Sequence, residues 1–310
     1  MLKLFYHSMV ILISILLLIF YTSTISNDFI QYQLIYDKLS ASEGSIEAII
    51  NNRFEPGFVV LYYYLSSFLS GSDTFILVAS IILSIKYILF TKYLNHPIAA
   101  WFLYIIIFLP VLEASQLRTA IASTVILYII LNPAFKEKFL FKAIFVSMFH
   151  YIGIIIYFLK FNTRPLLGLL VILLPGIFLD SILPLISTSV FKFDIFISTL
   201  DSGQSVNLFS SSMIMQFLIS LYCAFNWRNF NEMQKRGAYL IIIGLLVYIV
   251  LSHNPGIAHR VREVSLLGIF PLLFSSKMRI NYSALLLFSC VMYVCVYYLA
   301  FTVLEIIQLS

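Results

Sequence analysis

Apolar runs long enough to cross a lipid bilayer recur along this chain from one end to the other. A hydrocarbon core of about 30 Å needs roughly 20 consecutive apolar residues in a helix. Of the 310 residues, 61% are hydrophobic and 11% are charged, so a soluble fold of this length would lack polar surface. The runs leave no room for a separate soluble domain. The sequence therefore predicts a single all-α, polytopic membrane domain over 1–310.

We expect about 10 transmembrane helices, within a range of roughly 9–11. The expected membrane segments are approximately 4–22, 57–71, 74–91, 97–112, 117–131, 139–159, 165–180, 208–226, 237–252, 263–275 and 281–307. The first run is longer than the apolar core of a signal peptide, and no small-x-small cleavage site follows it. It is therefore expected to remain as a membrane helix.

The charges between these segments predict an orientation. Four stretches are basic: 135–142, 160–164, 226–237 and 275–279. Lys and Arg concentrate in cytoplasmic loops of membrane proteins, so these stretches are expected inside the cell. The two longer connections, 23–56 and 181–207, carry more acidic than basic residues and are expected on the extracytoplasmic side.

Two stretches conflict with a simple alternation of full crossings. Because 23–56 is expected outside and Lys92 inside, the stretch 57–91 should cross the membrane an odd number of times, but its length suggests two crossings. The stretch 139–159 is long enough for one crossing, yet it runs between two stretches that are both expected inside. Both conflicts lie beside polar motifs, "RFEPGF" (53–58) and "MFHY" (148–151). Non-helical backbone at membrane depth survives only where protein buries it or where it lines a wet cavity. Either the charge pattern misleads the predicted orientation, or these stretches contain short, broken or re-entrant helices; the neighbouring polar motifs favour the second explanation.

Several classes of protein are excluded by what the sequence lacks. No Walker or dinucleotide glycine motif is present, and no Cys/His spacing typical of a metal site occurs. Cys223, Cys290 and Cys295 lie in apolar segments and are interpreted as inert buried thiols. The net charge of +5 comes from basic residues scattered between membrane segments, so no nucleic acid partner is indicated. No metal and no cofactor are expected.

The segment "LEASQLRTAIA" (112–122) places Glu113, Gln116 and Arg118 between two apolar runs. A charge at the bilayer centre costs about 2.5–3.5 kcal/mol, so Arg118 is expected near the outer boundary, in a short turn. One interpretation is an arginine that snorkels and either pairs with Glu113 or caps a helix. The other is a guanidinium that faces an anionic ligand in an outward cavity.

A second polar group lies between two apolar segments, within 252–271. It contains His253, His259, Arg260, Arg262 and Glu263. The "NPG" triplet predicts a break, with a new helix starting near Ala258. Backbone N–H groups and fixed positive charge at a helix start suit a phosphate. The alternative is a simple pair between Arg260 and Glu263 on one helix face.

Two further residues are candidates for proton transfer or capping. His150 lies in an otherwise apolar stretch, where it is either a packing residue or a group able to take a proton near neutral pH. Glu55 directly precedes Pro56 and Gly57, at a helix start that it could cap.

The first connection combines carboxylates with aromatic rings in "SNDFIQYQLIYDKL" (26–39). Asp28, Tyr32, Tyr36 and Asp37 could line a short amphipathic helix at the interface. Proteins also bind sugars with such residues, because aromatic rings stack on the sugar face and carboxylates bond to its hydroxyl groups. The alternative is an interfacial tyrosine belt with solvated acids, and residue chemistry alone does not separate the two.

Five motifs in order resemble the Wzy/EpsG-type family of bacterial polysaccharide polymerases, over residues 26–274. They are "DFIQYQLIYD" (28–37), "RFEPGF" (53–58), "SQLRTAIA" (115–122), "MFHYIGI" (148–154) and "AHRVREVSLLGIFPLL" (258–273). The resemblance implies a multi-pass glycosyltransferase of the bacterial inner membrane. Such an enzyme joins oligosaccharide repeat units carried on undecaprenyl diphosphate at the periplasmic or outer face, in O-antigen or exopolysaccharide synthesis.

The resemblance also implies roles for the candidate residues. Arg118, Arg260 and Arg262 would hold the diphosphate and stabilise charge on the leaving group without a metal. His150, His259 and Glu55 are the candidate bases for the acceptor hydroxyl. The candidate substrate contacts are Asp28, Tyr32 and Asp37 toward sugar, with Gln116 and Glu263 beside the arginines. A flippase and a chain-length regulator are the expected protein partners, and undecaprenyl-diphosphate-linked glycans in membrane lipid are the expected substrates.

Two alternatives use the same residues. A flippase or transporter of the lipid-linked unit would bind the same diphosphate without bond chemistry. It should show a path of charges through the membrane and usually repeated halves, neither of which the sequence shows clearly. An O-antigen ligase, which transfers finished chains, is the nearer alternative within glycosyl transfer.

Overall fold

The computed structural model describes residues 2–25, 27–41, 54–132, 138–163, 210–252 and 255–275. Every regular element within these stretches is helical, which confirms the all-α fold. The chain divides into two compact units. Unit 1 comprises Met1–Leu131, Phe141–Ile154 and Val291–Ser310, and unit 2 comprises Asn132–Leu140 and Ile155–Cys290.

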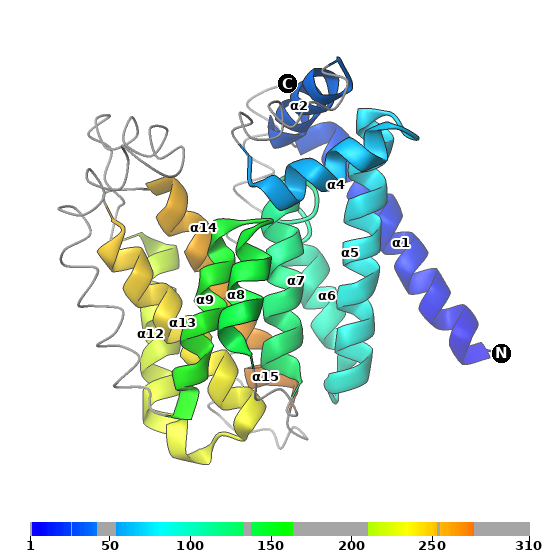
Figure 1. The fold of residues 1–310 in the computed structure, drawn as a ribbon. Coiled ribbons are helices and arrows are strands. Elements are labelled where there is room, and N and C mark those ends of the chain that lie inside the picture. The colour runs from blue at the N-terminus through cyan, green and yellow to red at the C-terminus, as the bar shows by residue number, and fades with distance from the viewer. Residues whose placement is uncertain are drawn as a thin grey trace, which may run out of the picture. The chain divides into compact units, whose positions relative to one another are not determined.

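Unit 1 is built around one long helix, α5, against which α1, α6 and α7 pack. A shorter helix, α4, lies across the end of α5 rather than along it, and α2 packs against both (Figure 1). The elements are α1 (Leu2–Ile25), α2 (Asn27–Ala41), α4 (Pro56–Ser66), α5 (Gly71–Tyr93), α6 (Pro97–Ile107), α7 (Leu117–Leu131), α8 (Phe139–Ser147) and the 3₁₀ turn η1 (Tyr151–Ile154).

Local sequence explains where these helices begin. Ser70 caps α5 by accepting a hydrogen bond from the backbone N–H of Asp73 at 3.2 Å, and Asp73 also complements the positive helix end. α4 and α6 each open with proline, whose missing N–H costs nothing at a first turn. Because Ser70 starts a new helix, the expected membrane segment 57–71 ends early, and Gly71 belongs to α5.

The predicted break at "MFHY" is confirmed. The expected segment 139–159 is interrupted after Ser147, where α8 ends, and three short elements follow. They are η1, α9 (Ile155–Phe158) and the 3₁₀ turn η2 (Leu159–Thr163). Whether this stretch is re-entrant stays a prediction.

Unit 2 is organised around α13 (Glu232–Val250), which packs against α12, α14, η4 and α15. Besides α9 and η2, the other elements of this unit are α12 (Ser211–Asn226), η3 (Trp227–Asn229), α14 (Pro255–Ser265), η4 (Leu266–Gly268) and α15 (Ile269–Phe274). A Cβ on Gly244 would overlap the side chain of Ser265, and one on Gly237 would overlap the backbone of Gly268. Small residues therefore let α13 approach the 255–274 stretch closely, as is common between membrane helices.

Three helices of the described chain are long and apolar enough to cross a membrane: Phe5–Thr22, Gly71–Tyr93 and Glu232–Val250. Shorter apolar helices occupy Pro56–Leu65, Pro97–Ile107, Leu117–Leu131 and Tyr151–Asn162. The expected total of about 10 spans is not confirmed. The expected segments 165–180 and 281–307, the connection 181–207, and Cys290 and Cys295 lie outside the described residues.

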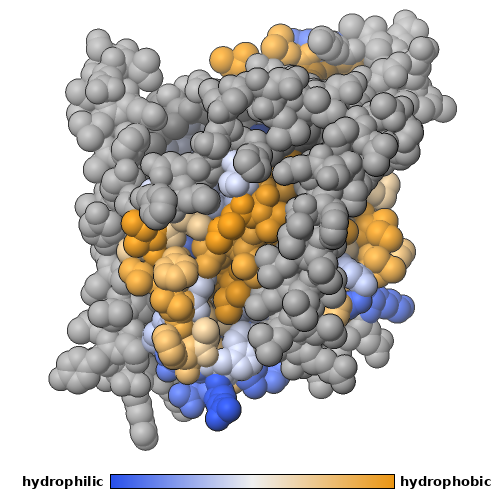
Figure 2. Space-filling view, turned by 90° about the vertical axis from the view of Figure 1, so that its left-hand side faces the viewer, coloured by the Kyte–Doolittle hydropathy of each residue, from blue (hydrophilic) through white to orange (hydrophobic). Residues whose placement is uncertain are grey.

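Apolar side chains are also exposed, as expected for contact with lipid. On α12, the exposed ones follow helical spacing along one face: Ile214, Phe217, Leu218, Leu221 and Phe225. Figure 2 shows apolar side chains over the middle of the face that it draws, with hydrophilic ones toward its lower edge. Large contiguous apolar surface is unusual for a soluble monomer and fits a membrane protein.

Candidate functional site

Arg118 forms a compact cationic group in unit 1 at the first turn of α7. Its Nη1 donates to Oε2 of Glu55 in an ion pair, and its guanidinium carbon lies 3.8 Å from the ring centre of Phe54. Tyr32 of α2 interacts with the same guanidinium. The two charged side chains are 13% and 18% exposed, so the pair is reachable from outside but partly desolvated. The aromatic face holds the guanidinium in place, and its positive charge remains accessible, as binding of an anion requires.

The structure changes the expected role of Glu55. Its backbone carbonyl accepts hydrogen bonds from the N–H groups of Phe58 and Val59, both at 3.1 Å, so the residue does stand at the start of α4. Its side chain, however, makes no capping hydrogen bond. The carboxylate pairs with Arg118 instead, because a guanidinium is a stronger partner than a backbone N–H.

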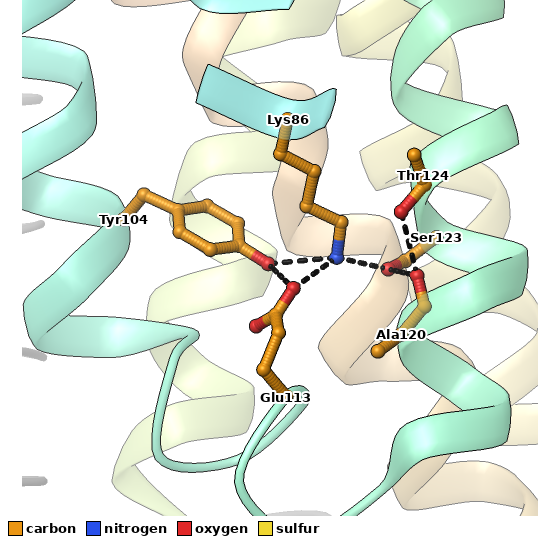
Figure 3. A network of polar contacts seen from close by, with 6 residues as sticks. All are labelled: Lys86, Tyr104, Glu113, Ala120, Ser123 and Thr124. Atoms are coloured by element: carbon orange, nitrogen blue, oxygen red, sulfur yellow. Dashed lines mark hydrogen bonds and ion pairs between the residues drawn. The ribbon is translucent and has the colours of Figure 1, made fainter. Parts of the chain in front are cut away.

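Glu113 does not pair with Arg118 but lies in a separate buried network in unit 1 (Figure 3). The ammonium of Lys86, on α5, donates to Glu113 Oε1 at 2.6 Å, to the Tyr104 hydroxyl at 2.8 Å and to Ser123 Oγ at 2.7 Å. The Tyr104 hydroxyl also donates to Glu113 Oε1 at 2.6 Å. All three N–H groups of the ammonium are therefore used, in a place where Lys86 and Glu113 are both 0% exposed.

Sequence reasoning missed Lys86. The signal was present, because Lys86 lies inside an apolar run and an ionisable residue within a membrane segment is a functional hypothesis by default. Its partner Glu113 lies 27 positions away in the chain. No local pattern links the two residues, so only the packing of α5 against the α6–α7 turn shows the pair.

His150 is fully buried in unit 1, directly after α8. Its Nδ1 accepts a hydrogen bond from the backbone N–H of Ile152 at 3.2 Å. Two residues before His150, the carbonyl of Met148 accepts from the N–H of Gly57 at 2.8 Å, and a Cβ on Gly57 would crowd that carbonyl. The motifs carrying His150 and Glu55, both predicted as breaks, are therefore joined by a backbone contact.

The expected sugar contacts on α2 do not share one face. Tyr32 is 4% exposed, and its ring packs against those of Phe54, Phe58, Tyr62 and Phe75. Asp37 is exposed on the same helix. The helix itself is confirmed, but Tyr32 serves the aromatic core and the Arg118 group rather than an open surface. Asp28 lies in α2, with its side chain outside the described part, and its contact with sugar stays a prediction.

Gln116 lies two residues before Arg118, where the turn enters α7. Its backbone N–H donates to the carbonyl of Leu112 at 2.8 Å, and its carbonyl accepts from Ala120 at 2.9 Å. The residue is half-buried. Its backbone thus belongs to the hydrogen bonding that shapes the turn, and a role of its side chain toward substrate stays a prediction.

A second cationic group lies in unit 2, between α13 and α14. The guanidinium of Arg262, which is 5% exposed, lies 5.2 Å from the ring centre of Tyr248, and His259 meets the same ring edge-on at 5.5 Å. Ser265 anchors this helix by donating to the carbonyl of Arg262 at 2.7 Å and accepting from Gln216 at 2.9 Å. Burial and the charge of Arg262 lower the pKa of His259, so its imidazole is favoured neutral, as a base requires.

The start of α14 differs slightly from expectation. The helix begins at Pro255 rather than near Ala258, because proline is well suited to a first helical turn. Arg260 and Glu263 are both half-buried on this helix. The expected sharing of one diphosphate by Arg118, Arg260 and Arg262 stays a prediction, since these residues belong to different units. His253 lies outside the described residues.

The fold and these buried charges define a helical membrane protein that carries partly buried cationic groups in both of its units. The EpsG family model matches residues 5–308, and the chain belongs to the EpsG family. That family is associated with glycosyltransferase-like polysaccharide polymerases. No curated protein and no solved structure matched the chain.

Proposed function

We propose that this protein is a polysaccharide polymerase of the bacterial inner membrane. It joins oligosaccharide repeat units carried on undecaprenyl diphosphate, at the periplasmic or outer face, in O-antigen or exopolysaccharide synthesis. Family membership supports the polymerase class. The observation that carries the substrate assignment is the Arg118–Glu55 pair, because it presents a partly exposed guanidinium against an aromatic ring.

The proposed reaction is glycosyl transfer between two lipid-linked substrates. A hydroxyl oxygen of the acceptor unit attacks the anomeric carbon of the donor chain, and the bond from that carbon to the diphosphate oxygen breaks. The hydroxyl proton passes to a base, and undecaprenyl diphosphate leaves with the bonding electrons. Arg118 would stabilise the negative charge that develops on this leaving group. Electrostatic stabilisation of this kind is usually the largest single contribution to catalysis.

Glu55 is the candidate base that the Arg118 group supports best. In the described state its carboxylate is paired with the guanidinium. A diphosphate that bound Arg118 would compete with that pairing and release the carboxylate within reach of the reacting groups. His150 is the second candidate, because its motif is joined by a hydrogen bond to the segment that carries Glu55. In unit 2, neutral His259 and the guanidinium of Arg262 offer the same combination of base and cation.

The test uses cells in which the gene is deleted and then restored as wild type, Arg118→Ala or Glu232→Gln. Glu232 pairs with Lys235 at 3.7 Å on an exposed helix turn, so its neutralisation is a control for breaking an ion pair away from the site. We expect single repeat units without the gene and a ladder of long chains with wild type or the control. Arg118→Ala should reach the membrane in normal amounts but give no ladder.

Three other results would contradict this proposal, and two of them would assign a different function. A normal ladder from Arg118→Ala would remove Arg118 from the site. Undecaprenyl-linked units trapped on the cytoplasmic side of deleted cells would show a flippase. Long chains that form but stay on undecaprenyl diphosphate would show a ligase.

A further inference from the structure

The Lys86 network attaches to the chain on both sides of Arg118. Glu113 lies five residues before Arg118 in the turn that leads into α7, and Ser123 lies five residues after it on α7. Both bond to the same ammonium nitrogen of Lys86, at 2.6 and 2.7 Å. We propose that Lys86 and Glu113 are positioning residues that hold the guanidinium of Arg118 in place for its anionic ligand. This inference rests on the proposed function.

The turn between Glu113 and Arg118 has little freedom to absorb a shift of its anchor. Ala114 donates to the carbonyl of Leu109 at 3.0 Å. The Ser115 hydroxyl donates to the carbonyls of Pro110 and Val111, at 3.0 and 2.7 Å. Backbone hydrogen bonds then continue directly into α7. A displacement of Glu113 is therefore carried to Arg118 rather than lost in a flexible loop.

The energetics of buried charge favour a geometric role over a purely stabilising one. Desolvating two charges offsets most of their attraction, so an apolar pair of similar volume often stabilises a fold equally well. What the ion pair adds is a fixed hydrogen-bond geometry. The ammonium donates only to acceptors placed around it, and Tyr104, Glu113 and Ser123 supply all three. The ammonium of Lys86 on α5 is thus hydrogen-bonded to α6, to the α6–α7 turn and to α7.

The network does not itself contact substrate. Lys86, Tyr104, Glu113 and Ser123 are each 0% exposed, whereas the Arg118 side chain is 13% exposed. All three N–H groups of Lys86 are bonded within the network, so Lys86 acts through the placement of Arg118. Lys86 and Glu113 are accordingly positioning residues and not catalytic ones.

The first test compares chain elongation by purified protein in lipid nanodiscs, with undecaprenyl-diphosphate-linked repeat units as substrate. Lys86→Met leaves Glu113 charged and unpaired, so the main variant is the double substitution Lys86→Met with Glu113→Gln, which removes both charges. Lys92→Met is the matched control, because Lys92 is an exposed lysine at the end of the same helix. We expect the folded double variant to elongate chains about 100-fold more slowly, as misplacing a reacting group by about 1 Å does. The control should keep wild-type activity.

The second test measures placement without relying on activity. Glu55→Cys and Arg118→Cys are introduced together in a chain whose three native cysteines are replaced by alanine, and a short bis-methanethiosulfonate reagent links the two thiols. We expect the linked fraction to fall at least about twofold when the double substitution of Lys86 and Glu113 is added. If that protein fails to fold, Ser123→Ala, which removes one uncharged acceptor, is measured in its place.

The outcomes separate this inference from the proposed function. An unchanged linked fraction in a folded variant would overturn the positioning role, whatever the activity. Wild-type elongation by that variant, together with loss of elongation by Arg118→Ala, would overturn the positioning role and leave the proposed function standing. If the wild-type protein elongates nothing, the proposed function fails, and the linked fraction still decides whether Lys86 places residue 118.

Discussion

Replacing Glu55 by glutamine should tighten the binding of undecaprenyl diphosphate and slow glycosyl transfer. Glutamine has nearly the shape of glutamate, so Phe54 and α4 keep their packing. Only the charge that Arg118 now faces is removed. The guanidinium then meets a neutral amide, which a diphosphate displaces more easily than a carboxylate.

The magnitude follows from the kind of contact. Glutamine keeps a hydrogen bond to the charged guanidinium, so the substitution removes only the attraction between two full charges, which is about 0.2–1 kcal/mol for an exposed ion pair. This pair is mostly buried, so its value should lie near the upper end, and about 1 kcal/mol corresponds to about fivefold in affinity. The side chains of Arg118 and Glu55 are 13% and 18% exposed, so solvent screens part of their attraction. The gain in affinity should therefore be largest at low salt. Loss of a general base slows transfer by about 10²–10⁴-fold.

The assay measures both quantities on protein in nanodiscs. Binding of undecaprenyl diphosphate is followed by intrinsic fluorescence at low and high salt, and turnover by the rate of chain elongation, with Glu232→Gln as the control for charge removal. Tighter binding with slower turnover supports both roles of Glu55. Weaker binding would refute the idea that the carboxylate competes with the ligand. Unchanged turnover would remove Glu55 as the base.

Three further results are expected on stability, each measured by thermal or denaturant unfolding of the protein in detergent or nanodiscs. Lys86→Met alone should cost about 3–5 kcal/mol by leaving Glu113 charged and buried, and adding Glu113→Gln should restore most of it; equal loss in both variants would contradict this. Gly244→Ala should cost about 1–3 kcal/mol through overlap with Ser265, and Ser265→Gly should relieve it. Because burial lowers the pKa of His259, the unfolded chain binds the proton more readily, and stability should decline as pH falls below about 6.5. His259→Gln should reduce that decline, and an unchanged pH profile would show that the imidazole is not held neutral.

Much of the fold is readable from local patterns. Apolar runs and their interruptions predict an all-helical membrane protein, and the expected segment 117–131 coincides with α7. The breaks around His150 and just before Pro255 of the "NPG" triplet are also predicted, because helix-breaking residues and charges in an apolar run act within a few positions. The sequence alone also singles out Arg118, Glu55 and Arg262. Each charge lies beside apolar segments, where placing a charge costs free energy.

The sequence by itself determined the class of protein, the positions of several helices and the residues that require an explanation. Only the tertiary structure decided which charges meet. Arg118 pairs with Glu55, 63 positions away, while the nearer Glu113 is taken by Lys86 on α5. Tyr32 likewise proved to be part of an aromatic core. An ion pair depends on distance in space, and helices packed side by side bring together residues that no local spacing relates.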